Sequence, residues 1–253
     1  MNIISFRLQG KMAHFRRYYS NSSALSYSVP PRTTVIGILA GLLGYERDSY
    51  YDLFNLEQCQ IALSSRTPIK KTIQKMNLLK IENLSRDANG FLGVHSQTAT
   101  ELVLPQNIRT GLLDFQIWIH HRDSDIMKRL EDILGLADDV YHTCGTSVSL
   151  GTANHLGWIK YDGVYEGERM EPNLAEKIDS IIPANQIDQL QMPPDSFTYR
   201  LVKEDIPLEF DNNRRLTKGG KSVMIINLIN SPIFAKVHQL VALDNGTKIV
   251  WMQ

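Results

Sequence analysis

The fold of this chain is decided by the stretch Pro30–Gly44, with the sequence PPRTTVIGILAGLLG. Two successive prolines force an extended entry, because each fixes its own φ and disfavours helical backbone in the residue before it. Thr33 then offers a helix cap, and the apolar run Val35–Leu43 predicts a short helix that ends at the next glycine. One stripe of this helix has almost no side chains and lets another backbone approach closely. Its glycines are Gly37, Gly41 and Gly44.

Apolar and alternating runs on both sides of this helix predict the strands of one sheet. A second helix, capped by Ser124 and closed at Gly135, carries an apolar stripe from Ile126 to Leu134. The resulting order, strand, helix, strand, strand, helix, strand, is the ferredoxin-like pattern and indicates an α+β fold. The expected strands are Ile3–Leu8, Gln60–Ser64, Leu113–Ile119 and Trp158–Tyr161.

A long insertion separates the second and third strands. Residues 66–109 far exceed a hairpin loop of ~2 to 5 residues, and Asn89-Gly90 predicts a turn inside them. We therefore expect a first domain over residues 1–165 with an inserted hairpin at about 66–109, an acidic connecting segment over 166–195, and a small β-rich region over 196–253. The last region should end in a hairpin that turns at Asp244-Asn245-Gly246.

Composition excludes several classes of protein. The 253 residues are 43% hydrophobic, enough for a sizeable core, and 27 basic residues balance 27 acidic ones. Cys59 and Cys144 lie far apart without metal-ligand spacing, so we expect neither a disulfide framework nor a metal site, and a reducing cytoplasm fits. The longest apolar run, Val35–Leu43, is too short to span a bilayer, so we expect no membrane segment. We also expect no cofactor.

Charge is unevenly distributed along this neutral chain. Residues 1–45 hold five basic residues and no acid, the insertion holds seven basic residues against three acids, and residues 162–195 are acidic. Near Arg16 and Arg17 the basic residues alternate with aromatic ones, as single-stranded nucleic-acid binding requires. A solvated basic face beside core aromatics explains the same spacing, and on spacing alone it is slightly favoured. The aromatic or ring-bearing residues are His14, Phe15, Tyr18 and Tyr19.

Several motifs together resemble the CRISPR-associated family five. That family comprises the RAMP-type subunits that bind the 5′ handle of the guide RNA in type I Cascade, and the similarity is greatest to the type I-B branch. The matching residues are Gly10, Ala13, Phe15, Arg16, Ser26-Tyr27, Pro30–Thr33, Gly37–Gly44, Arg66–Lys71, Val148–Ala153 and Asp244–Val250.

The resemblance implies a ferredoxin-like (RRM-like) RAMP domain whose insertion forms a thumb that folds over the RNA. It implies a non-catalytic crRNA-binding subunit in antiviral defence, which holds the 5′ handle and caps the backbone filament. The implied partners are the handle, the backbone RAMP subunit and the large subunit, with target double-stranded DNA near the PAM as a further candidate. The expected RNA-binding residues are Arg16, Arg17, Tyr27, Arg32, Gly37, Gly41, Lys70, Lys71, Lys75, Arg86 and Arg109. Of these, Tyr27 either stacks on a base or closes the core, and we favour the core.

Two other functions remain open. A metal-independent endoribonuclease acting on CRISPR repeats would need a general base and an acid or cation, and strand-end histidines bonded to the next loop are the favoured interpretation instead. The candidates for such a site are His14, Tyr18 or Tyr19, His120, His121 and Lys71. A protein-interaction subunit without direct RNA contact would use the acidic segment. The loop 212–222 has four basic residues and is expected to be a hairpin tip, since Arg215 replaces the glycine that a phosphate-binding loop needs.

Overall fold

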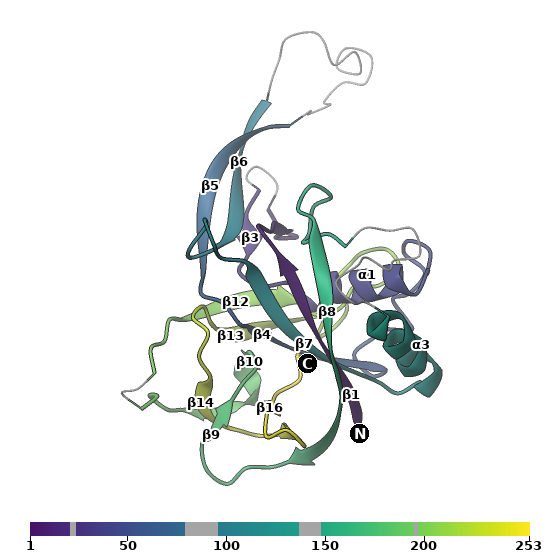
Figure 1. Ribbon diagram of the computed structural model, residues 1–253, viewed down its shortest axis with the longest axis vertical. Helices are drawn as coiled ribbons and strands as arrows, with labels where there is room; N and C mark the ends of the chain where they lie inside the picture. The colour runs from purple at the N-terminus through teal and green to yellow at the C-terminus, as the bar shows by residue number, and fades with distance from the viewer. Residues whose placement is uncertain (21–23, 79–95, 137–147, 195–196) are drawn as a thin grey trace.

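A computed structural model describes residues 1–20, 24–78, 96–136, 148–194 and 197–253. The fold is mixed, strand-rich and contains a curled antiparallel sheet with two helices (Figure 1). The elements in chain order are β1 (Asn2–Gly10), β2 (Phe15–Arg16), β3 (Ser26–Tyr27), α1 (Arg32–Leu42), β4 (Cys59–Ser65), β5 (Ile69–Leu78), β6 (Ser96–Pro105), β7 (Leu113–His121), α3 (Ser124–Gly135), β8 (Gly157–Met170), β9 (Glu176–Ile178), β10 (Ile182–Pro183), a 3-10 turn (Ala184–Gln186), β11 (Ile187–Leu190), β12 (Leu201–Pro207), β13 (Lys221–Asn227), β14 (Ile233–Val237), β15 (Leu240–Leu243) and β16 (Lys248–Ile249).

The central sheet has six strands in the order β16-β15-β8-β1-β7-β4. β1 lies between β7 and β8 and is antiparallel to both, with Phe6 opposite Ile117 and Tyr161. α1 follows β1 and α3 follows β7 along the chain. The four strands predicted from the sequence therefore all form and lie side by side, although β8 extends well beyond the expected Trp158–Tyr161.

The main core lies on one face of this sheet. Alternate residues of β1, Ile4, Phe6 and Leu8, are 0–1% exposed and pack with Phe115 and Ile117 of β7. Side chains of α1, α3, β12 and β13 belong to the same apolar cluster. Burying each such side chain stabilises the fold by about 1.5–3 kcal/mol.

The glycine-rich stretch forms α1 by a different capping arrangement from the one predicted. The helix begins at Arg32 after Pro31, and no side chain caps it, so the predicted cap by Thr33 is wrong. The end at Gly44 is confirmed: Gly44 has φ +78°, and the N–H of Tyr45 donates to the carbonyl of Ala40, which closes the helix with the hydrogen-bond pattern typical of a left-handed glycine.

The N-cap of α3 lies one residue earlier than predicted. The Asp123 carboxylate, rather than Ser124, accepts the N–H of Asp125 at 2.8 Å, because Asp123 is the residue with extended backbone before the helix. The predicted apolar stripe is confirmed, with Ile126, Leu130 and Leu134 buried. The predicted end of the helix at Gly135 is confirmed as well.

The insertion between β4 and β7 contains a long hairpin. β5 and β6 pair from Ile69 opposite Pro105 to Leu78 opposite Ser96, and the ribbon projects away from the rest of the chain (Figure 1). Its buried side chains lie at the proximal end, including Ile69 at 1% and Val103 at 0% exposure. We call residues 69–74 and 100–105 the hairpin base.

The later part of the chain is rich in strands and interleaved with its surroundings. β15 and β16 pair as predicted around the turn at Gly246, where φ is +84°, and β15 adds to the central sheet beside β8. The expected boundary at residue 165 falls inside β8. Strands from the acidic segment pair with later strands, β10 with β13, and β9 and β11 with β14.

Candidate nucleic-acid interface

The hairpin base is joined to the rest of the chain along both of its edges. On the β6 side, Ala13 and Val103 exchange two backbone hydrogen bonds at 2.9 and 3.0 Å, and the N–H of Glu101 donates to the carbonyl of Ala24. On the β5 side, the N–H of Ile69 donates to the carbonyl of Leu228 at 2.9 Å. The ribbon therefore starts from a fixed platform.

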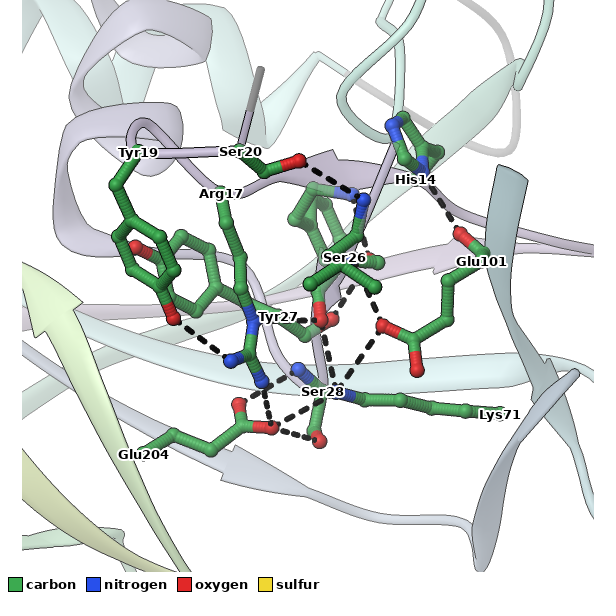
Figure 2. A network of polar contacts seen from close by, with 12 residues as sticks. His14, Arg17, Tyr19, Ser20, Ser26, Tyr27, Ser28, Lys71, Glu101 and Glu204 are labelled. Atoms are coloured by element: carbon green, nitrogen blue, oxygen red, sulfur yellow. Dashed lines mark hydrogen bonds and ion pairs between the residues drawn. The ribbon is translucent and has the colours of Figure 1, made fainter. Parts of the chain in front are cut away.

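Glu204 of β12 organises the side chains at this platform. It is 8% exposed, and its carboxylate accepts hydrogen bonds from the N–H and hydroxyl of Ser28 at 2.8 and 2.7 Å. The ammonium of Lys71 lies 2.8 Å away and the guanidinium of Arg17 3.2 Å away. Figure 2 shows these groups converging on Glu204. Two cations and one nearly buried carboxylate thus bind β5 to β12 and to the segment before β3.

Glu101 of β6 adds a second carboxylate beside Lys71. Its Oε2 accepts the N–H of Ser26 at 2.9 Å and lies 3.6 Å from the Lys71 ammonium. Lys71 also donates to the carbonyl of Ser26 at 2.7 Å. We call Arg17, Lys71, Glu101 and Glu204 the carboxylate cluster. Within it Lys71 is fully engaged in structural contacts.

Arg17 links this cluster to the aromatic rings of Tyr19 and Tyr27 near β2 and β3. It donates to the Tyr19 hydroxyl at 2.8 Å and lies 5.5 Å from the centre of the Tyr27 ring. Burial acts to lower the pKa of Arg17, but the Tyr19 hydrogen bond and the Glu204 charge outweigh it, so the pKa is raised. The guanidinium stays charged and is held in one orientation.

The structure separates the remaining lysines of the hairpin. Side chains alternate along a strand, so Lys71 and Lys75 lie on one face of β5 and Lys70 on the other. Lys75 is exposed and Lys70 half-buried, and neither has a hydrogen-bond or ion-pair partner among the described residues. Arg16 and Arg109 are exposed, and Arg16 donates to the carbonyl of Ser20. Arg86 lies outside the described residues.

Arg32 is buried, against the expectation that it lines a groove for RNA, and its side chain is 0% exposed. Burial lowers the pKa of Arg32, and its two terminal nitrogens, Nη1 and Nη2, donate to backbone carbonyls from two distant segments. It tethers α1 to the loops before β4 and after β12. The acceptors are Leu208 at 2.8 Å, Phe54 at 2.9 Å, Asn55 at 3.0 Å and Cys59 at 2.6 Å.

Tyr27 and the helix glycines also belong to the packed interior or its rim. Tyr27 is 1% exposed, which confirms the core interpretation. A Cβ added at Gly37 would meet the Tyr50 hydroxyl at 3.4 Å, so this glycine faces the segment after α1 and not the hairpin. Gly41 accepts the N–H of Gly44 through its carbonyl.

The histidines named as candidate bases are bonded to backbone carbonyls. His14 Nδ1 lies 2.7 Å from the Glu101 carbonyl, His120 Nδ1 2.8 Å from that of Asn2, and His121 Nε2 2.9 Å from that of Leu53. His14 lies at the hairpin base, whereas His120 and His121 lie at the end of β7. The structure therefore does not bring these three side chains to one site.

The basic loop 212–222 connects β12 to β13, which confirms the predicted hairpin tip. Arg214 makes a two-pronged ion pair with Asp48, at 3.0 and 2.8 Å. These two are the non-glycine residues with positive φ in the described ranges, at +58° and +65°.

Among the described residues no group of three His, Cys, Asp or Glu is placed to hold a metal ion, and neither described helix could cross a membrane.

Sequence reasoning missed Glu204 and the aromatic contact between Tyr18 and Phe210, whose ring centres are 6.3 Å apart. No local signal could have found either, since their partners come from opposite ends of the chain.

Comparison with known proteins finds a family whose model matches the first part of the chain. Residues 3–111, from β1 through the hairpin, match the family described as CRISPR-associated protein (Cas_Cas5). No curated protein sequence matches the chain. The family match supports a CRISPR-associated protein of this kind over the first part of the chain.

Solved structures share the fold over nearly the whole chain. A CRISPR protein from Archaeoglobus fulgidus superimposes with a TM-score of 0.60 at 10% identity, covering 99% of both chains. A chain of a CRISPR RNA-guided surveillance complex has a TM-score of 0.50 at 13% identity, covering 93% of this chain and 92% of that one. These likenesses concern the fold and cover more than 90% of this chain.

Proposed function

We propose that this chain is a non-catalytic subunit of a type I CRISPR surveillance complex, in which it binds the guide RNA, holds its 5′ handle and caps the backbone filament. The family match over residues 3–111 supports the assignment, because it covers β1, α1 and the hairpin together. A chain of similar fold occurs in a CRISPR RNA-guided surveillance complex.

The observation that carries the proposal is the anchoring of the hairpin. A ribbon that projects from the body can hold a flexible strand only if its base is rigid, and here the carboxylate cluster and backbone bonds on both edges secure that base. Exposed Lys75 and half-buried Lys70 supply cations for phosphates on the two faces of the ribbon.

The fold is consistent with the RAMP assignment. Helices follow β1 and β7, and the central strands lie in the order β8-β1-β7-β4, as in a ferredoxin-like unit. We assign this unit to residues 1–165 and the thumb to residues 66–109. The proposed setting is a type I-B complex in the cytoplasm, with the backbone RAMP subunit and the large subunit as partners.

The absence of catalysis is part of the proposal. A metal-independent cut needs a base and a cation at one site, and His14, His120 and His121 are bonded to carbonyls at two separate places. Incubating the purified chain with repeat RNA should therefore leave the RNA intact. A specific cut within the repeat, abolished by His14→Ala or His121→Ala, would contradict this.

The binding proposal is tested by co-expressing the chain with the neighbouring subunits and a CRISPR array, purifying it, and sequencing the RNA that remains bound. We expect guide RNAs that share a repeat-derived 5′ end. The complex should assemble without RNA if the chain is instead a protein-interaction subunit, and recovery of such an RNA-free complex as the main product would reject RNA binding.

A further inference from the structure

Exposed aromatic side chains gather at one place beside the hairpin base. In the described ranges the exposed aromatic residues are Tyr18 at 41%, Tyr19 at 48% and Tyr199 at 40%. Tyr18 and Tyr19 contact each other edge to face, with ring centres 5.2 Å apart. Tyr199 does not belong to this pair; its hydroxyl donates to the sulfur of Met192.

Contacts with Phe210 and Arg17 hold the two tyrosine rings in place. Tyr18 packs edge to face on Phe210, which follows β12, at 6.3 Å between ring centres. Tyr19 accepts a hydrogen bond from Arg17, which Glu204 fixes in turn. The rings are therefore positioned before any ligand arrives, which lowers the loss of side-chain freedom on binding.

Cations surround these rings, and the neighbouring carboxylates are already paired. Lys221 at the start of β13 donates to Asp205 at 2.9 Å and keeps half of its side chain exposed. Lys221 lies opposite Pro207 in the β12–β13 pair, and Phe210, on which Tyr18 packs, follows Pro207 by three residues. The hydrogen bond to Asp205 raises the pKa of Lys221. Glu204 is occupied by Arg17 and Lys71. We call Tyr18, Tyr19, Phe210 and Lys221 the tyrosine patch.

From this geometry we infer that the tyrosine patch is a stacking site for an unpaired base of single-stranded RNA that runs from the hairpin towards the loop after β12. The inference rests on the proposed function and adds a subsite to it. Flat rings beside cations bind single strands because every unpaired base has a free π-face, whereas duplex bases do not. A protein partner is the competing occupant.

The test uses the full chain and a single-stranded RNA of the repeat sequence recovered with it, carrying 2-aminopurine at successive positions. We expect fluorescence quenching at one position on binding. Tyr18→Leu keeps an apolar contact with Phe210 but removes the ring, and should weaken binding roughly 5- to 100-fold, as should Tyr19→Leu. Tyr18→Phe should bind like the wild type.

The matched control is Tyr199→Leu, which removes an equally exposed ring from another surface and should leave affinity unchanged. Because stacking involves no phosphate, the dependence of affinity on salt should keep its slope in both patch variants. If Tyr18→Leu alters folding, Tyr19→Leu provides the decision, because Tyr19 is the more exposed ring.

Two results would overturn the inference, and they separate it from the proposed function. If both Leu variants keep the RNA affinity and quenching of the wild type while Lys75→Gln weakens binding, the stacking site is rejected and RNA binding by the chain still stands. The tyrosine patch would then be a surface for a protein partner. No binding of guide RNA by the wild type would overturn the proposed function and the patch together.

Discussion

The ammonium of Lys71 lies 2.8 Å from the carboxylate of Glu204, although 133 residues separate the two in sequence. This contact joins the start of β5, at the base of the projecting ribbon, to β12, and Arg17 binds the same oxygen from a third segment. A lysine that would be taken for a phosphate contact on charge alone is thus a structural residue that fixes the direction of the hairpin.

Glu204→Gln should destabilise the fold by about 2–3 kcal/mol. Breaking a fully buried ion pair removes ~3–5 kcal/mol, and the loss is smaller here because Lys71 and Arg17 keep 21% and 24% side-chain exposure. Urea unfolding measures the change. The control is Asp205→Asn on the same strand, whose pair with Lys221 is solvent-exposed and should contribute less than ~1 kcal/mol. Equal effects of the two variants would contradict the central role of Glu204.

Arg32→Met should lower the free energy of unfolding by on the order of 3–5 kcal/mol, because it leaves buried carbonyls without a donor. Arg109→Gln, at an exposed position without a described side-chain partner, should change stability by less than ~0.5 kcal/mol. Both are measured by urea unfolding. A stable Arg32→Met protein with weakened RNA binding would restore Arg32 to the interface.

Lys75→Gln should reduce the slope of log affinity against log salt by about 0.7 for one lost contact to single-stranded RNA. Lys70→Gln should do so separately, since the two side chains lie on opposite faces of β5. The measurement is RNA binding across a salt series. Lys177→Gln serves as the control, because that lysine is exposed on β9 and paired with Asp179. A slope that stays the same in both hairpin variants would move the RNA away from the ribbon.

Replacing residues 79–95 by a short Gly-Ser link should leave the thermal midpoint nearly unchanged, because among the described residues of β5 and β6 the buried side chains lie at the hairpin base. Retention of the guide 5′ end should be lost, as measured by sequencing bound RNA. A Gly-Ser segment of native length is the control that separates reach from side-chain contacts. A truncated protein that unfolds, or one that still holds the guide normally, would reject the thumb assignment.

Stability should fall as pH drops below the ordinary histidine range. Burial, followed by the charge of His14, lowers the pKa of His155 from 6.5, so the folded state binds fewer protons than the unfolded state. The contribution is complete above pH ~6.5 and is lost as pH falls below it. Urea unfolding at two pH values should show a smaller loss for His155→Gln than for the wild type. His120, whose pKa burial also lowers, should behave likewise. An equal loss of stability in the wild type, in His155→Gln and in a matching His120 variant would assign the acid sensitivity to other groups.

Local features of this protein were readable from its sequence. Alternation in Ile3–Leu8 predicted β1 and its buried face, the glycine run predicted the end of α1 at Gly44, and the length of residues 66–109 predicted an insertion that contains a hairpin. These features depend on residues close together in the chain, whose spacing matches the geometry of a strand, a helix or a turn. Motif resemblance predicted a CRISPR-associated family, and a family model of that description matches residues 3–111.

The tertiary structure alone decided which basic residues are free. Arg32, Lys71 and Arg17 have the same local appearance as Arg16 and Lys75, yet the first is buried and the next two are paired. Their partners include the Leu208 carbonyl after β12 and the Glu204 carboxylate within it, each more than 130 residues away in sequence, and no local pattern encodes that distance. A charged side chain is identical in the sequence whether it faces water or a buried acceptor, because its role depends on which distant groups the fold places around it.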